Sequence, residues 1–115
     1  MRFMCMVNMD PAITTKLTED EWQRFQRDNQ AFDEELMAAG RFVMASPLDQ
    51  PQSAVTIRLR KGATMMTDGP FVETKEYIAG FIIFEAGNYE EARQIASRSA
   101  FTRVGSVELR ALVEY

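Results

Sequence analysis

Two segments of this 115-residue chain are apolar on both sides of a strand, and they restrict its fold more than any other feature. Residues 2–9, RFMCMVNM, and residues 77–85, YIAGFIIFE, carry apolar side chains at odd and even positions alike. Successive side chains of a strand point to opposite faces. Both segments are therefore predicted to be central strands of a sheet that is covered on both sides. Gly80, inside the second segment, predicts a β-bulge or a close approach of another backbone.

Two helices are predicted from their N-terminal caps. Residues 18–21, TEDE, have the spacing of a capping box, and apolar residues at helical spacing continue almost to Gly40. Because Gly commonly follows the last turn of a helix, this helix is expected at about 19–39. Asn88, followed by Glu91, predicts the start of a second helix. Its expected inner face consists of Ala92, Ile95 and Ala96.

Strand patterns occur in three further places. Residues 41–48 and 106–114 are predicted strands, and the second has Val107, Leu109, Ala111 and Val113 on one face. Residues 54–60, AVTIRLR, alternate cleanly, which is typical of a half-buried strand. Its apolar face consists of Val55, Ile57 and Leu59, and its polar face of Thr56, Arg58 and Arg60. Lys61-Gly62 predicts a turn, after which residues 63–66 return as the second arm of a hairpin.

The order of these elements predicts one α+β domain over residues 1–115, with a ferredoxin-like βαββαβ fold and an extra hairpin. Both helices would lie on one face of an antiparallel sheet. The other face is apolar in both central strands, so its exposure to water is unfavourable. A second sheet from an identical subunit is the simplest cover. We therefore expect a homodimer that is joined through its sheet faces.

Composition excludes several classes of function. The net charge is −4 and the basic residues are scattered, so no direct binding of nucleic acid is expected. The N-terminal apolar run is too short for a signal peptide or a membrane span, and the single Cys5 excludes an internal disulfide. We expect a cytoplasmic protein without membrane contact. Histidine is absent, which excludes Ser-His-Asp and Cys-His catalysis and His-ligated zinc. No metal and no cofactor are expected.

Charged residues gather in residues 67–76, TDGPFVETKE. Asp68, held by a Gly-Pro turn, is the candidate catalytic acid or base. Lys75 and Arg58 are candidates for holding a small polar or anionic molecule. Further candidate binding residues are Phe71, Glu73 and Thr74.

Each of these residues also has a structural interpretation. The Asp-Gly-Pro sequence can be only a turn, with Asp68 bonded to its own backbone and Phe71 in the core. The charges of residues 73–76 can be a solvated network. Arg58 can lie on the wet side of an edge strand. Cys5, Trp22 and the eight Met residues are expected to fill the core or the dimer interface.

The string DGPFVETKE, followed by a strand with an internal Gly, resembles the DGPF motif of the YCII-related family. The first strand, the Trp-containing helix and the closing GSVELRALVE are similar to that family as well. The resemblance implies a dimeric α+β barrel with a cleft on each subunit. It also implies a His-Asp pair as the catalytic element of the wider group. Asp68 matches the Asp of that pair, but this chain has no His, so the His-Asp mechanism is out of reach here.

Two functions remain open. The first is a small-molecule-binding protein that acts as a cofactor-independent isomerase or lyase, with Asp68 in an inter-sheet cleft. The second is a non-catalytic interaction or sensing module. Some members of the resembled family are associated with sigma factors, which implies a regulatory context for this alternative.

Overall fold

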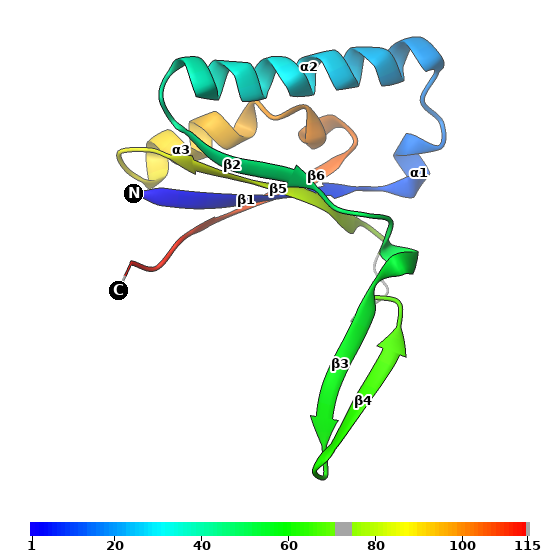
Figure 1. The fold of residues 1–115 in the computed structure, drawn as a ribbon. Coiled ribbons are helices and arrows are strands. Elements are labelled where there is room, and N and C mark those ends of the chain that lie inside the picture. The colour runs from blue at the N-terminus through cyan, green and yellow to red at the C-terminus, as the bar shows by residue number, and fades with distance from the viewer. Residues whose placement is uncertain (71–74, 115) are drawn as a thin grey trace.

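The computed structural model describes residues 1–70 and 75–114 and has an α+β, ferredoxin-like fold with a long hairpin (Figure 1). Four strands form an antiparallel sheet in the order β2-β5-β1-β6: β1 (Arg2–Met9), β2 (Phe42–Pro47), β5 (Tyr77–Glu85) and β6 (Gly105–Ala111). A separate hairpin consists of β3 (Val55–Arg60) and β4 (Ala63–Asp68). The helices are α1 (Pro11–Thr14), α2 (Glu19–Ala38) and α3 (Tyr89–Ser97), with 3-10 turns η1 (Pro51–Ser53) and η2 (Ala100–Arg103). The predicted fold class and order of elements are confirmed.

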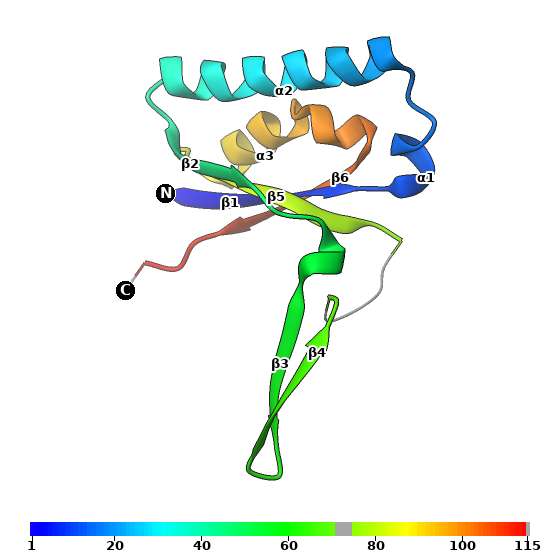
Figure 2. The ribbon, with the colours of Figure 1, turned by 45° about the vertical axis from the view of Figure 1, so that its right-hand side comes forward.

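Helices α2 and α3 cover one face of the four-stranded sheet, and the core lies between the two layers (Figures 1 and 2). Phe3 and Phe84 are paired across β1 and β5, are almost completely buried, and have ring centroids 6.0 Å apart. The predicted inner face of α3 is confirmed, since Ala92, Ile95 and Ala96 are its buried residues. The buried residues of α2 are Phe25, Phe32 and Leu36.

The predicted caps explain where both helices begin. The Thr18 side chain accepts a hydrogen bond from the Glu21 backbone N–H, and the Glu21 carboxylate accepts one from the Thr18 N–H, as in a capping box. The Asn88 side chain caps α3 by accepting from the Glu91 N–H. Gly40 follows α2 with a φ of 70°, a conformation that Gly adopts without strain.

Both predictions for Gly80 are confirmed. The register of β1 against β5 shifts between Val7, which pairs with Gly80, and Asn8, which pairs with Ile78, so β5 contains a bulge. A Cβ on Gly80 would lie 2.7 Å from the Ser46 carbonyl oxygen of β2. Gly therefore allows β2 to approach β5 at this point.

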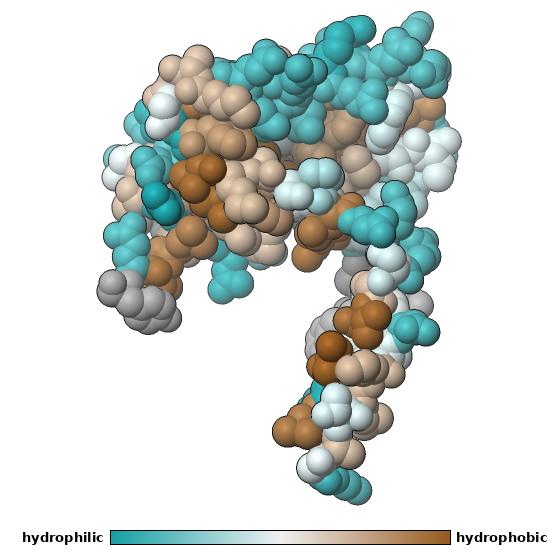
Figure 3. Space-filling model, in the orientation of Figure 1, coloured by the Kyte–Doolittle hydropathy of each residue, from teal (hydrophilic) through white to brown (hydrophobic). Residues whose placement is uncertain are grey.

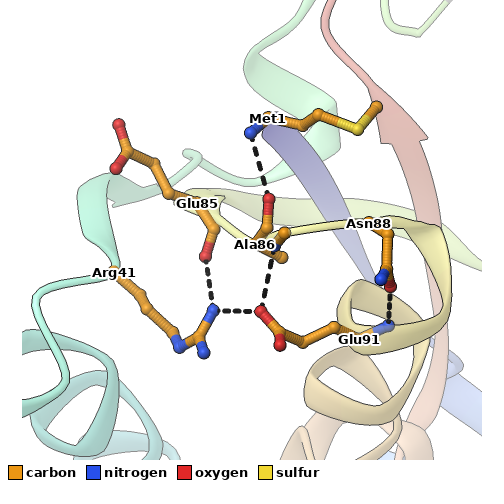
Figure 4. A network of polar contacts seen from close by, with 7 residues as sticks. Met1, Arg41, Glu85, Ala86, Asn88 and Glu91 are labelled. Carbon is orange, nitrogen blue, oxygen red and sulfur yellow. Dashed lines mark hydrogen bonds and ion pairs between the residues drawn. The ribbon is translucent and has the colours of Figure 1, made fainter.

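Polar contacts tie the start of α3 to the strand ends beside it (Figure 4). Arg41 donates to the Glu85 carbonyl and to the Glu91 carboxylate, which also accepts from the Gly87 N–H. The N-terminal amine of Met1 donates to the Ala86 carbonyl over 3.0 Å. These bonds fix where β1, β5 and α3 meet.

The hairpin corrects one prediction. Val55, Ile57 and Leu59 were expected on the buried side of a half-buried strand, but they are 53%, 61% and 65% exposed. The reason is that β3 pairs only with β4, outside the four-stranded sheet, and projects on the side opposite the helices (Figures 1 and 2). The second arm is also longer than predicted, since β4 continues to Asp68.

The helix-free face of the sheet is apolar and only partly covered. Met4 and Met6 of β1 and Phe81 and Ile83 of β5 are half-buried there. Apolar residues also run along the hairpin (Figure 3). The Met residues were predicted to fill the core and the dimer interface. The core part of this prediction is wrong for Met1, Met37, Met44, Met65 and Met66, which are exposed, and the interface part stays a prediction.

Two smaller differences concern the chain after β5. The last strand ends at Ala111 rather than residue 114, and Val113, predicted on the same face as Val107, Leu109 and Ala111, is 73% exposed.

Trp22, predicted in the core, is half-buried against it, and Cys5 is buried as expected. Within residues 1–70 and 75–114, no helix combines the length and apolar character that crossing a membrane requires.

Candidate functional site

The predicted turn after Asp68 is present at the base of the hairpin. Gly69 has a φ of 97°, and its N–H donates to the Ala54 carbonyl over 2.6 Å. The Thr56 hydroxyl donates to the Gly69 carbonyl over 3.0 Å. These bonds close the base of the hairpin. Asp68 itself is exposed at the end of β4.

The structure describes two of the other predicted site residues, Lys75 and Arg58. Lys75 is exposed just before β5, and Arg58 is half-buried on β3. Phe71, Glu73 and Thr74 lie outside the described residues. Asp68, Lys75 and Arg58 do not line either of the two cavities discussed next.

A cavity of about 210 Å³ lies between α2 and the strands β2 and β5. Val7, Ile82 and Phe101 form apolar parts of its wall, and the backbone beside Gly80 and Pro47 forms its edge. The lining also includes Ser46 of β2 and two polar side chains of α2, Asn29 and Asp33.

Asn29 and Asp33 are one helical turn apart, which places them on the same side of α2. The Oδ1 atom of each is buried and has no hydrogen-bond partner among the described residues. Burial raises the pKa of the Asp33 carboxyl above its ordinary value, because it disfavours the charged form. Buried polar atoms in native proteins nearly always have a partner, so these two oxygens mark a place for one.

This arrangement suits a ligand that donates hydrogen bonds. A carboxylate oxygen only accepts, and a protonated carboxyl also donates. A hydroxyl or amine group in the cavity would satisfy the acceptor atoms while the apolar wall contacts the rest of the molecule. With a raised pKa, Asp33 is also better suited than an ordinary Asp to exchange a proton near neutral pH.

Sequence reasoning missed Asn29 and Asp33. The sequence does contain a signal for them, since Asn29 comes four residues after Phe25 and Asp33 three residues before Leu36, inside the apolar stripe of α2. Polar residues within such a stripe must either find a partner or face a cavity.

A second cavity, of about 200 Å³, lies between α2 and α3, but its charged groups are paired. Arg41 pairs with Glu91, and Arg98 pairs with Glu35 over 3.1 Å. The four charged side chains that line this cavity thus neutralise one another in two ion pairs. Among the described residues, no group of three acidic or Cys side chains is arranged to hold a metal ion.

The surroundings of Cys5 make it an unreactive thiol. It is 1% exposed, and burial raises its pKa to about 11. Since the thiolate is the nucleophilic form, Cys5 is a packing residue of the core.

Comparisons with known proteins agree with this fold. An uncharacterised protein of Rhizobium meliloti (strain 1021) is 32% identical over 108 residues, which cover 92% of this chain and 87% of that protein. A similar solved structure is 5-chloro-2-hydroxyhydroquinone dehydrochlorinase (TftG) from Burkholderia phenoliruptrix, in complex with 2,5-dihydroxybenzoquinone. It has a TM-score of 0.55 and 15% sequence identity, and the match covers 100% of this chain and 96% of that one. The model of the YCII-related domain matches residues 1–115, and this chain therefore belongs to the YCII-related domain family.

Proposed function

We propose that this protein binds a small molecule bearing hydroxyl or amine groups in the cavity between α2 and the sheet. The observation that carries this proposal is the pair of buried, unpartnered oxygens of Asn29 and Asp33 beside that cavity. Leaving such atoms unsatisfied costs roughly 1–3 kcal/mol each. A ligand that supplies the missing donors recovers this free energy on binding.

The cavity limits the size of the ligand. Its volume of about 210 Å³ is below the roughly 300–1,000 Å³ of pockets for larger ligands. It exceeds the roughly 150 Å³ of a cavity that accepts benzene. A one-ring hydroxylated compound or a short amine fits this range. The 2,5-dihydroxybenzoquinone bound by the structurally similar dehydrochlorinase is of that size class, which supports the choice of ligand class.

We further propose that the protein is a cofactor-independent enzyme of the lyase or isomerase type, with Asp33 as its proton donor and acceptor. Its raised pKa favours this role over that of a permanently ionised carboxylate. The similarity to a dehydrochlorinase supports this class of reaction, and it does not support the role of Asp33.

Asp68 is the second candidate for the acid or base. In that case Lys75 and Arg58 position the substrate at a cleft between two subunits, and Phe71, Glu73 and Thr74 are the further predicted binding residues. The two proposals differ in which carboxylate the activity requires. Comparing Asp33→Asn with Asp68→Asn therefore shows which of the two sites is used.

The experiment is a titration followed by NMR of backbone amides, with hydroquinone, catechol and 2,5-dihydroxybenzoquinone as probes. We expect at least one probe to shift amides around the cavity, such as those of Ala45 and Phe101. Asp33→Asn should weaken that binding, whereas Glu34→Gln, an exposed neighbour on the same helix, should not. If Asp68→Asn abolishes binding and Asp33→Asn does not, the site lies at the hairpin base. If no probe shifts a cavity amide, the cavity holds water only and the proposal fails.

We also propose a cytoplasmic homodimer that is joined through the helix-free sheet faces. The support is the half-buried apolar row of Met4, Met6, Phe81 and Ile83, which water covers poorly. Sedimentation equilibrium over a range of concentrations tests it, because a protein that stays monomeric throughout contradicts it. A non-catalytic interaction module remains the alternative if a dimer forms but no probe binds.

A further inference from the structure

We propose that the β3–β4 hairpin is an arm that packs on a second copy of this chain. The contact surface, here called the arm face, has four apolar side chains, Val55, Ile57, Leu59 and Met66, and the pairing places Thr64 and Asp68 on the same face. This inference rests on the proposed homodimer, but it adds a separate surface to it. The arm would make the dimer interface larger than the two sheet faces alone.

The arm face follows from strand pairing. Val55, Ile57 and Leu59 alternate along β3, and Met66 of β4 lies directly opposite Ile57. All four side chains are between 53% and 69% exposed. The opposite face of the hairpin carries Arg58, half-buried, and its neighbour across the strands, Met65. The hairpin is thus amphipathic like a strand pair that packs one side on a core, but within residues 1–70 and 75–114 this side stays exposed.

An isolated two-stranded hairpin is only marginally stable in water. The β3–β4 pair forms a sheet of its own, and both views show it standing away from the body (Figures 1 and 2). It projects on the helix-free side of the four-stranded sheet, so it extends toward whatever covers that face. A second copy on that face would lie within its reach.

The shape of the chain supports an arm of this kind. The radius of gyration is 16.2 Å, whereas a compact domain of this length is expected at about 13 Å. The accessible surface is 8069 Å², against about 6,400 Å² for a folded monomer of this mass. The excess is about 1,700 Å² per chain. If two copies bury this surface against each other, the total falls within the roughly 2,000–5,000 Å² of obligate homodimers.

Charge complementarity favours another copy of this chain as the occupant. Residues 55–68 carry three cationic side chains, Arg58, Arg60 and Lys61, against the single acid Asp68. The whole chain has a net charge of −4, so the remainder of the molecule is more acidic than the total. The pairing places Arg58 and Arg60 on the side of the hairpin opposite the arm face, so these cations favour the approach of the arm to an acidic partner subunit and are not contacts of the arm face itself.

The first test is photo-crosslinking of the full chain. A photoreactive amino acid replaces Thr64, which lies on β4 opposite Leu59. In the control it replaces Gln26 on the exposed side of α2. We expect a covalent dimer from position 64 and none from position 26. Mass spectrometry of the cross-linked peptides then shows whether position 64 reached the other subunit.

The second test compares two identical substitutions on adjacent residues. Met66→Gln lies on the arm face, and Met65→Gln lies on the opposite face. Because Met66→Gln replaces an apolar side chain that the arm buries in the dimer, it should raise the dimer dissociation constant at least roughly tenfold. Met65→Gln should leave it nearly unchanged. Sedimentation equilibrium measures both.

The outcomes separate the arm from the dimer itself. A covalent dimer from position 64, together with a weaker dimer for Met66→Gln alone, supports the arm. A protein that is monomeric at every concentration overturns both the dimer and the arm. A wild-type dimer that neither cross-links from position 64 nor responds to Met66→Gln overturns the arm and leaves the sheet-to-sheet dimer standing.

Discussion

Asn29 and Asp33 lie one turn apart on α2, and each keeps a buried side-chain oxygen without a partner among the described residues, beside the same cavity. Nothing in the packing of the chain requires two polar residues there, since Phe25, Phe32 and Leu36 already anchor α2 to the sheet. A helix optimised for stability alone would have apolar residues at both positions. Residues that lower the stability of a protein locally, as these two do, are typical of a binding site.

Asp33→Asn should stabilise the protein near pH 7. Burial raises the pKa of Asp33 in the folded state, so the folded protein binds this proton more tightly than the unfolded chain does. The buried carboxyl therefore lowers the free energy of unfolding. This loss is absent below the unfolded pKa of about 3.9 and grows as the pH rises from there through the raised folded pKa. We expect a gain of about 1 kcal/mol or less, because the carboxyl retains some contact with water.

Thermal unfolding from pH 3 to pH 8 measures this effect. The melting curves of wild type and Asp33→Asn should converge at the acidic end and separate toward neutrality. Glu34→Gln should follow wild type throughout. A variant that is less stable than wild type at pH 7 would mean that the Asp33 carboxylate is held by a partner in solution.

Glu91→Gln should have the opposite pH dependence. The Gly87 N–H and the Arg41 guanidinium donate to this carboxylate and lower its pKa below the ordinary value. Its contribution to stability is therefore present above the unfolded pKa and is lost as the pH falls through the lower folded pKa. The variant should melt below wild type at pH 7 and approach it in acid. Glu90→Gln, in the same helical turn, is the control, and an equal effect of both changes would refute a specific role for the contacts in Figure 4.

Gly80→Ala should be strongly destabilising. The new Cβ would lie 2.7 Å from the Ser46 carbonyl oxygen and 3.1 Å from the Pro47 Cα, and both are backbone atoms that a rotamer change cannot move. Overpacking of this kind costs about 1–3 kcal/mol. Gly87→Ala is the matched control, since its nearest neighbour would be the Glu91 side chain at 3.8 Å. Urea unfolding of both variants compares them, and equal midpoints would show that β2 does not approach β5 so closely.

Cys5 should resist alkylation until the protein unfolds. With a pKa of about 11, roughly one thiol in a thousand is ionised at pH 8. The side chain is also 1% exposed. Iodoacetamide should therefore label the native protein only on the timescale of global opening, and labelling should become rapid in denaturant. Fast labelling of the native protein, measured by intact mass, would mean that β1 opens locally.

Local chemistry in the sequence determined most of the secondary structure. The capping residues Thr18 and Asn88 predict helix starts that the structure confirms. A cap is predictable because it depends only on a hydrogen bond from the backbone N–H three residues further along the chain. The order of elements then selected the ferredoxin-like sheet, and the bulge at Gly80 followed from a Gly inside an apolar strand. The DGPF string indicated the family because it is long and specific.

Tertiary structure alone decided two matters. Alternation predicts that β3 has an apolar face but not what that face contacts, so the exposure of Val55, Ile57 and Leu59 depended on β3 pairing outside the main sheet. Likewise, Asn29 and Asp33 differ from other polar residues of α2 only because the strands beneath them leave a cavity there. Side-chain pattern is a local property of the chain, whereas the space opposite a side chain is set by residues far away in sequence.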